Sequence, residues 1–128
     1  MITGGFGAEG LGAETSTEIY FPHTGKTCSL ANLPNERLGH TANNWGDMLS
    51  PILCGGGNST CLKFNPSSAS GMWVNYNKTM EERKYHTSWV FSGIPGRPKL
   101  FLFGGIINNE ETAELVNEGP SYKIAKSR

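Results

Sequence analysis

The chain has 128 residues and a mass of 13.9 kDa, which suffices for one domain of ordinary size. Eleven basic residues balance eleven acidic ones, so the sequence has no excess of positive charge that would indicate binding to nucleic acid or to an anionic membrane surface. No apolar run approaches the roughly 20 residues that cross a bilayer. Glycine is the anomaly, because 17 residues is nearly twice the usual share of about 7%.

Short apolar and β-branched runs, bounded by Gly, Pro, Asn and Ser, predict strands along the whole chain. No window holds apolar residues at helical spacing over eleven or more positions. In chain order, the expected strands lie near residues 1–3, 17–21, 26–30, 40–45, 51–55, 61–65, 72–76, 86–91, 99–103, 113–116 and 121–125. The sequence therefore predicts an all-β fold.

Two markers recur in these runs. Double glycines stand at Gly4-Gly5, Gly55-Gly56 and Gly104-Gly105, with 51 residues from Gly5 to Gly56 and 49 from Gly56 to Gly105. An Arg-x-x-His-Thr motif at Arg37 and His40 returns 46 residues later at Arg83 and His86. A recurrence near 50 residues indicates an internal structural repeat. We divide the single repeat region into units at 1–36, 37–82 and 83–128.

Each complete unit should contain four strands, with a double glycine closing the second, an aromatic residue in the third and a tryptophan opening the fourth. The middle unit has Phe64 and Trp73 at the last two places, and the first unit has Tyr20 at the aromatic place. This pattern resembles the kelch repeat. The resemblance implies that each unit is a four-stranded antiparallel blade of a β-propeller.

The number of units is too small for a closed propeller. Such rings contain about four to eight blades, whereas 128 residues supply about two and a half, and the first unit begins at its second strand. We expect an incomplete ring, which is a fragment of a longer protein or a truncated gene product.

The repeated markers have a structural interpretation and a functional one. Glycine pairs suit places where backbones crowd or φ is positive. Arg37 with His40, and Arg83 with His86, could form acid–base pairs, but recurrence in successive units favours an anchoring role. We expect the arginines to bond backbone carbonyls where one blade crosses to the next.

The first glycine cluster also fits a dinucleotide-binding pattern. Gly5, Gly7 and Gly10 have the spacing of the Gly-x-Gly-x-x-Gly fingerprint, which requires a helix to begin at the loop. The following residues, 11–17, are glycine-rich and β-branched, which favours a loop that enters a strand. A dehydrogenase fragment built on these glycines is the less favoured alternative. An oxidase with a kelch-like propeller is another alternative.

Three cysteines give no metal-binding spacing. Cys54 and Cys61 lie on neighbouring expected strands, where a cross-strand disulfide is geometrically feasible, which would leave Cys28 over. Asn58 and Asn77 begin glycosylation sequons in expected loops. These features fit an extracellular propeller, while free thiols fit a cytosolic one, so the compartment stays open.

The loops after the second and fourth strands of a blade emerge at the same face. This face should display acidic and amide side chains, which suits a protein partner. Its candidate residues are Glu9, Glu36, Asn58, Glu82, Asn108 and Glu110.

The sequence thus predicts a non-enzymatic protein-interaction module with no cofactor and no metal. Its partner would be a protein rather than nucleic acid or membrane. One specific form of this function is a substrate receptor for a ubiquitin ligase, which needs an adaptor domain outside this chain.

Overall fold

The structure is a computed structural model that describes residues 1–8, 12–45, 47–91, 98–106, 112–116 and 122–126. For residues 47–49, 78, 80, 112–116 and 122–126 it describes the backbone alone. No helix in these described ranges is long and apolar enough to cross a membrane.

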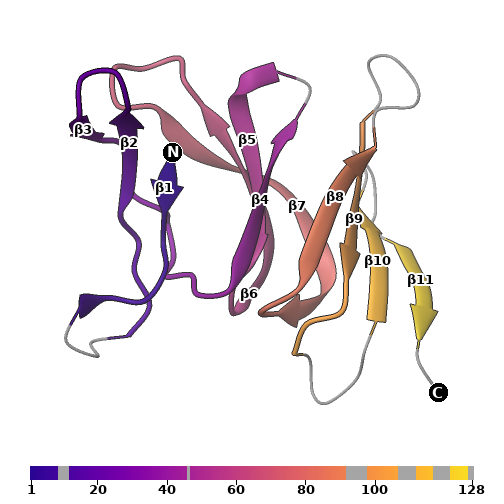
Figure 1. Ribbon diagram of the computed structural model, residues 1–128. Coiled ribbons are helices and arrows are strands. Elements are labelled where there is room, and N and C mark those ends of the chain that lie inside the picture. Colours follow the sequence, from indigo (N-terminus) through magenta and orange to yellow (C-terminus); the bar gives the residue numbers. More distant parts are fainter. Residues whose placement is uncertain (9–11, 46, 92–97, 107–111, 117–121, 127–128) are drawn as a thin grey trace.

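The described strands form three antiparallel sheets that stand side by side (Figure 1). The first sheet contains β1 (Ile2–Thr3), β2 (Thr17–Phe21) and β3 (Lys26–Ser29) in that order. The middle sheet contains β4 (His40–Trp45), β5 (Asp47–Gly55), β6 (Asn58–Asn65) and β7 (Met72–Arg83). The last sheet contains β8 (Thr87–Phe91), β9 (Lys99–Phe103), β10 (Thr112–Val116) and β11 (Tyr122–Lys126). In every sheet, strands adjacent in sequence are neighbours in space.

The predicted all-β class is confirmed, and the strands lie close to the expected positions. The largest difference is β7, which continues to Arg83 rather than ending near residue 76. The pairing of β6 with β7 shifts register between Asn58 and Thr60 and between Cys61 and Leu62, and both shifts place the extra residues on β7, so that the ladder reaches the pair Asn58 and Arg83. Such bulges were not visible in the alternation pattern, because the extra residues lie on one strand only.

The middle sheet is buried on both faces. Toward the first sheet it packs Leu53, Leu62, Phe64 and Trp73 against Leu30 and Leu33. Toward the last sheet it packs Trp45, Ile52, Cys54 and Cys61 against Leu100 and Leu102. This two-sided burial explains why residues 51–54 are a continuous apolar run, since alternate residues of β5 enter opposite cores.

Candidate functional site

Where the structure describes them, the loops predicted to share one face do so. In Figure 1 the connections β1–β2, β3–β4, β5–β6 and β7–β8 lie at the lower end of the three sheets. Glu36 and Glu82 are exposed there. Glu9, Asn108 and Glu110 lie outside the described residues, so the structure adds nothing about them.

Asn58 also lies at this end, but its side chain serves the turn between β5 and β6. Its Oδ1 accepts hydrogen bonds from the backbone N–H of Thr60, at 2.9 Å, and from the Thr60 hydroxyl, at 2.8 Å. Asn58 is half-buried. It therefore stabilises the turn between β5 and β6, and its side-chain oxygen is engaged within the protein.

The second sequon is tied to the fold in a similar way. Asn77 is half-buried and pairs with Cys61 across the β6–β7 ladder. The hydroxyl of Thr79 is buried and donates to the carbonyls of Ser59 and Glu81, at 3.0 and 2.7 Å. The expected loop positions of both sequons are wrong, because Asn58 begins β6 and Asn77 lies within β7, which continues beyond its expected end. Glycosylation of Asn58 and Asn77 stays a prediction.

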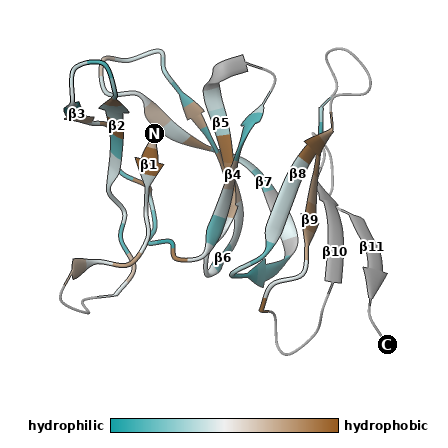
Figure 2. Ribbon diagram, in the orientation of Figure 1, coloured by the Kyte–Doolittle hydropathy of each residue, from teal (hydrophilic) through white to brown (hydrophobic). Residues whose placement is uncertain are grey.

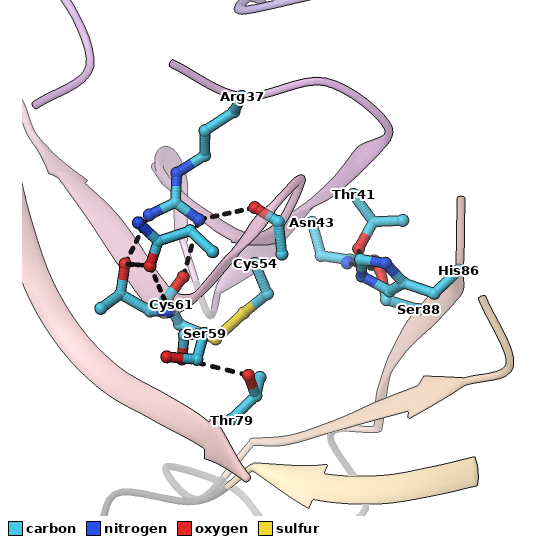
Figure 3. Close-up of a disulfide and its surroundings, with 12 residues drawn as sticks. Arg37, Thr41, Asn43, Cys54, Ser59, Cys61, Thr79, His86 and Ser88 are labelled. Carbon is cyan, nitrogen blue, oxygen red and sulfur yellow. Dashed lines mark hydrogen bonds between the residues drawn. A yellow bond between two sulfur atoms is a disulfide. The ribbon is translucent and has the colours of Figure 1, made fainter. Parts of the chain in front are cut away.

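Arg37 lies in the connection between β3 and β4 and links this connection to the middle sheet. Its fully buried guanidinium donates to the carbonyl of Gly55 at 2.6 Å, to the carbonyl of Thr60 at 2.8 Å and to the Thr60 hydroxyl. Figure 3 shows the guanidinium directed at these groups beside the disulfide. Burial lowers the pKa of Arg37 to about 10. The carbonyl dipoles offset part of the cost of placing a cation away from water.

Arg83 occupies the corresponding place one unit later. It is fully buried and donates to the carbonyl of Gly104 at 2.8 Å, as Arg37 does to Gly55. Each arginine thus bonds the first glycine of the double glycine that follows it in the chain. The structure places both side chains in the anchoring role expected from the sequence.

The backbone carbonyls of the two arginines bond the double glycines that precede them in the chain. Arg37 accepts a hydrogen bond from the N–H of Gly5, and Arg83 accepts one from the N–H of Gly56, both at 2.8 Å. A Cβ added to Gly4 or to Gly55 would lie 2.8 Å from the same carbonyls, and both glycines have positive φ. Close backbone approach therefore requires these glycines. Each junction between sheets runs from double glycine to arginine to the next double glycine.

The histidines pack within the same junctions. His86 shares a hydrogen bond of 2.8 Å with the hydroxyl of Thr41, and the amide of Asn43 donates to the Ser88 hydroxyl (Figure 3). These contacts hold β4 of the middle sheet beside β8 of the last sheet. Burial, with a smaller contribution from the charge of Arg83, lowers the pKa of His86 to about 4. Burial and the charge of Arg37 lower the pKa of His40 as well.

A disulfide joins Cys54 on β5 to Cys61 on β6, which face one another in the ladder with Cα atoms 4.2 Å apart. Both residues are almost completely buried. Cys28, on β3, is exposed and free.

The glycines of the dinucleotide fingerprint lie in a hairpin-like loop. Phe6 and Ala13 form an isolated bridge, and the N–H of Gly7 donates to the carbonyl of Gly12 at 2.8 Å. Residues 12–16 then lead into β2. Gly10 lies outside the described residues, and a strand follows where the fingerprint requires a helix.

An open groove of about 670 Å³ lies between the first and middle sheets, which the sequence reasoning missed. It adjoins β1, the edge strand of the first sheet. No motif marks it in the sequence, because its lining comes from residues spread over two sheets and their connections. The groove is lined by apolar and neutral polar residues: Met1, Thr3, Ile19, Leu30, Ala42, Asn43, Asn44, Pro51, Phe64, Pro66, Ser68, Ala69, Gly71 and Trp73.

No group of three or more His, Cys, Asp or Glu side chains within the described ranges comes together as a metal site would need. Comparison of the chain with known family models and with curated proteins finds no match.

Proposed function

We propose that this chain is a non-enzymatic protein-interaction module built from blades of a kelch-type β-propeller. The kelch part of the proposal is supported by the repeated junction, in which Arg37 and Arg83 make the same bond to successive double glycines. Repetition of one junction between successive antiparallel sheets is what a radial array of blades would need.

The observation that carries the interaction function is the surface at the lower end of the sheets. Connections from neighbouring sheets gather there, and Glu36 and Glu82 are exposed on them. Buried arginines and a network of backbone bonds hold these connections in place. A rigid scaffold that presents adjacent loops is a common design for binding sites.

The titratable groups with lowered pKa values support the same function. Arg37, His40 and His86 lie inside the junctions, where they bond or pack against the protein's own backbone and side chains. Their burial explains the shifts, so a structural role accounts for them without a reaction.

A binding experiment with charge reversal tests this proposal. The chain is used as bait in an extract of its source cells, beside the double variant Glu36→Lys, Glu82→Lys. Lys26→Glu is the matched control, because Lys26 is exposed on β3, at the other end of the first sheet. We expect the same proteins with the wild type and with Lys26→Glu, and their loss with the double variant. Retention of every partner by the double variant would contradict the proposal.

The disulfide favours a second candidate, in which the same module works in an oxidising, extracellular compartment. Disulfides persist in such compartments and are rare in the cytosol. Mass spectrometry of the protein from its source, alkylated before and after reduction, tests this. A linked Cys54–Cys61 peptide supports the extracellular module, and two free thiols in the native protein contradict it.

A further inference from the structure

The Cys54–Cys61 disulfide is enclosed in the interior of the protein. Cys54 is 1% exposed and Cys61 is 0% exposed. They lie on β5 and β6, which are the two inner strands of the middle sheet, with β4 and β7 on either side. Because thiol–disulfide exchange begins when a thiolate attacks a disulfide sulfur, this bond is out of a reductant's reach while the sheets stay packed.

The two cysteine side chains face the last sheet. They pack in one core with Leu100 and Leu102 of β9, whose apolar character Figure 2 shows. Leu53, which adjoins Cys54 in β5, packs on the opposite side of the middle sheet, against the first sheet. The last sheet therefore covers the disulfide as a lid, and the first sheet does not.

The turn between the two cysteines gives no easier access to the sulfurs. Arg37 donates to the carbonyls of Gly55 and Thr60, which are the residues next to Cys54 and Cys61. Opening of the turn would break the hydrogen bonds of a fully buried guanidinium, which is costly, and would still leave the sulfurs beneath β9. Separation of the last sheet from the middle sheet uncovers the sulfurs and keeps these bonds.

The middle and last sheets are able to separate as units. Each is a hydrogen-bonded ladder of its own, so their separation breaks no strand pairing within either sheet. Side chains join them at β4 and β8, where Thr41 bonds His86 and Asn43 bonds Ser88. Undocking of the last sheet is thus a local opening, which needs less free energy than global unfolding.

We propose that Cys54 and Cys61 form a guarded redox switch, in which exchange takes place only while the last sheet is undocked. Docking then preserves the redox state that is present, because buried thiols pack as small apolar groups. In the open form, a dithiol reductant supplies two electrons. One of its thiolates attacks a cysteine sulfur, and the other cysteine leaves as a thiolate. The second thiol of the reductant then closes a cyclic disulfide and releases the first cysteine, and the two protons of the dithiol pass to the cysteines.

Reduction kinetics of matched leucine variants test the proposal. All proteins carry Cys28→Ser, so that the disulfide is the one source of new thiols. Leu102→Ala weakens the core that covers the disulfide, and Leu33→Ala weakens the core on the opposite face of the same sheet. Dithiothreitol is added, free thiols are alkylated at timed intervals, and mass spectrometry measures the fraction of doubly labelled protein. Circular dichroism and denaturant unfolding give the strand content and the global stability of each variant.

We expect the folded parent protein to be reduced about a hundredfold or more slowly than the same chain unfolded in urea. Leu102→Ala should be reduced about tenfold or more faster than Leu33→Ala, although both substitutions remove a buried leucine side chain. Ser88→Ala removes one bond of the junction and leaves both cores intact, so it should also speed reduction. It provides the comparison with the parent if Leu102→Ala does not fold.

Three results would overturn the proposal. Reduction of the folded parent as fast as the unfolded chain would mean that the sulfurs are accessible without undocking. Equal acceleration by Leu102→Ala and Leu33→Ala would mean that global unfolding, rather than undocking of the last sheet, exposes the bond. Acceleration by neither Leu102→Ala nor Ser88→Ala would assign the access to the turn between β5 and β6.

Discussion

The middle sheet and the two outer sheets have corresponding residues and very different burial. Phe64 is 5% exposed in the middle sheet, whereas Tyr20 at the same place in the first sheet is 50% exposed. Trp45 is 5% exposed, whereas its counterpart Phe91 in the last sheet is 46% exposed. The difference teaches that a repeat unit of this kind is not stable alone. Its apolar faces are buried only when a neighbouring sheet stands on each side.

The largest expected contrast is between Trp73 and Trp89. Trp73→Ala should lower the free energy of unfolding by about 3–5 kcal/mol, because it removes a buried indole and its edge contact with Phe64 at 5.2 Å. Trp89→Ala should change it by about 1 kcal/mol or less, since Trp89 is mostly exposed. Denaturant unfolding measures both, at a protein concentration low enough to keep the chain monomeric. Equal losses of unfolding free energy for the two substitutions would contradict the difference in burial between the middle and last sheets.

Acid should weaken the junction between the middle and last sheets. Burial lowers the pKa of His86 to about 4, below its ordinary value of 6.5, so the unfolded chain binds this proton first as the pH falls. The stabilisation from a neutral His86 is complete above about pH 6.5 and is lost progressively down to about pH 4. The expected loss is about 3 kcal/mol.

The control for this effect is His23, in the exposed turn between β2 and β3. Unfolding free energies are measured between pH 7 and pH 4 for the wild type, His23→Gln and His86→Gln. His23→Gln should follow the wild type, and His86→Gln should have a shallower dependence on pH. A wild-type slope in His86→Gln would exclude His86 as the origin.

The disulfide should stabilise the middle sheet by an intermediate amount. Cys54 and Cys61 enclose a short loop, with a sequence separation of 7, for which loop-closure entropy gives about 2.5 kcal/mol. Replacement of both cysteines by alanine should lower the unfolding free energy by that amount or slightly more, because both side chains are buried. Cys28→Ser, on the exposed strand β3, should have no measurable effect. A larger loss in Cys28→Ser than in the double variant would contradict the prediction.

The smallest expected effect distinguishes the two junctions. Gly39 and Tyr85 occupy the same place in the Arg-x-x-His motif, and both have positive φ, +72° and +55°. A tyrosine is sterically strained at positive φ, whereas a glycine is not. Tyr85→Gly should therefore raise the unfolding free energy, by about 1 kcal/mol or less, while Gly39→Ala lowers it. A loss of stability in Tyr85→Gly would show that the contact between the Tyr85 ring and Gly39 matters more than the backbone strain.

Much of this fold is predictable because two recurring markers and a strand alternation were visible in the sequence. The double glycines and the arginine–histidine motif marked the junctions, and their recurrence separated an anchoring role from a catalytic one. The register shifts between β6 and β7 were not predictable, because they depend on how the longer strand β7 pairs with the shorter strand β6 as far as Arg83. The groove and the uncovered faces were not predicted either, because burial in stacked sheets depends on which neighbours are present.

The candidate site was predictable only in outline. Strand alternation sufficed to place Glu36 and Glu82 at one end, since connections in antiparallel sheets emerge at alternate ends. It could not indicate that the Asn58 side chain would turn back to bond Thr60, because that bond depends on the local turn between β5 and β6.

Native-state hydrogen exchange tests the central claim, that the middle sheet derives its stability from neighbours on both sides, most directly. The backbone amides of β5 and β6 in the middle sheet should exchange slowest, close to the rate of global unfolding. Amides of β2 and β3 in the first sheet should exchange at least tenfold faster, because that sheet has one uncovered face. Equal protection in the first and middle sheets would contradict the account.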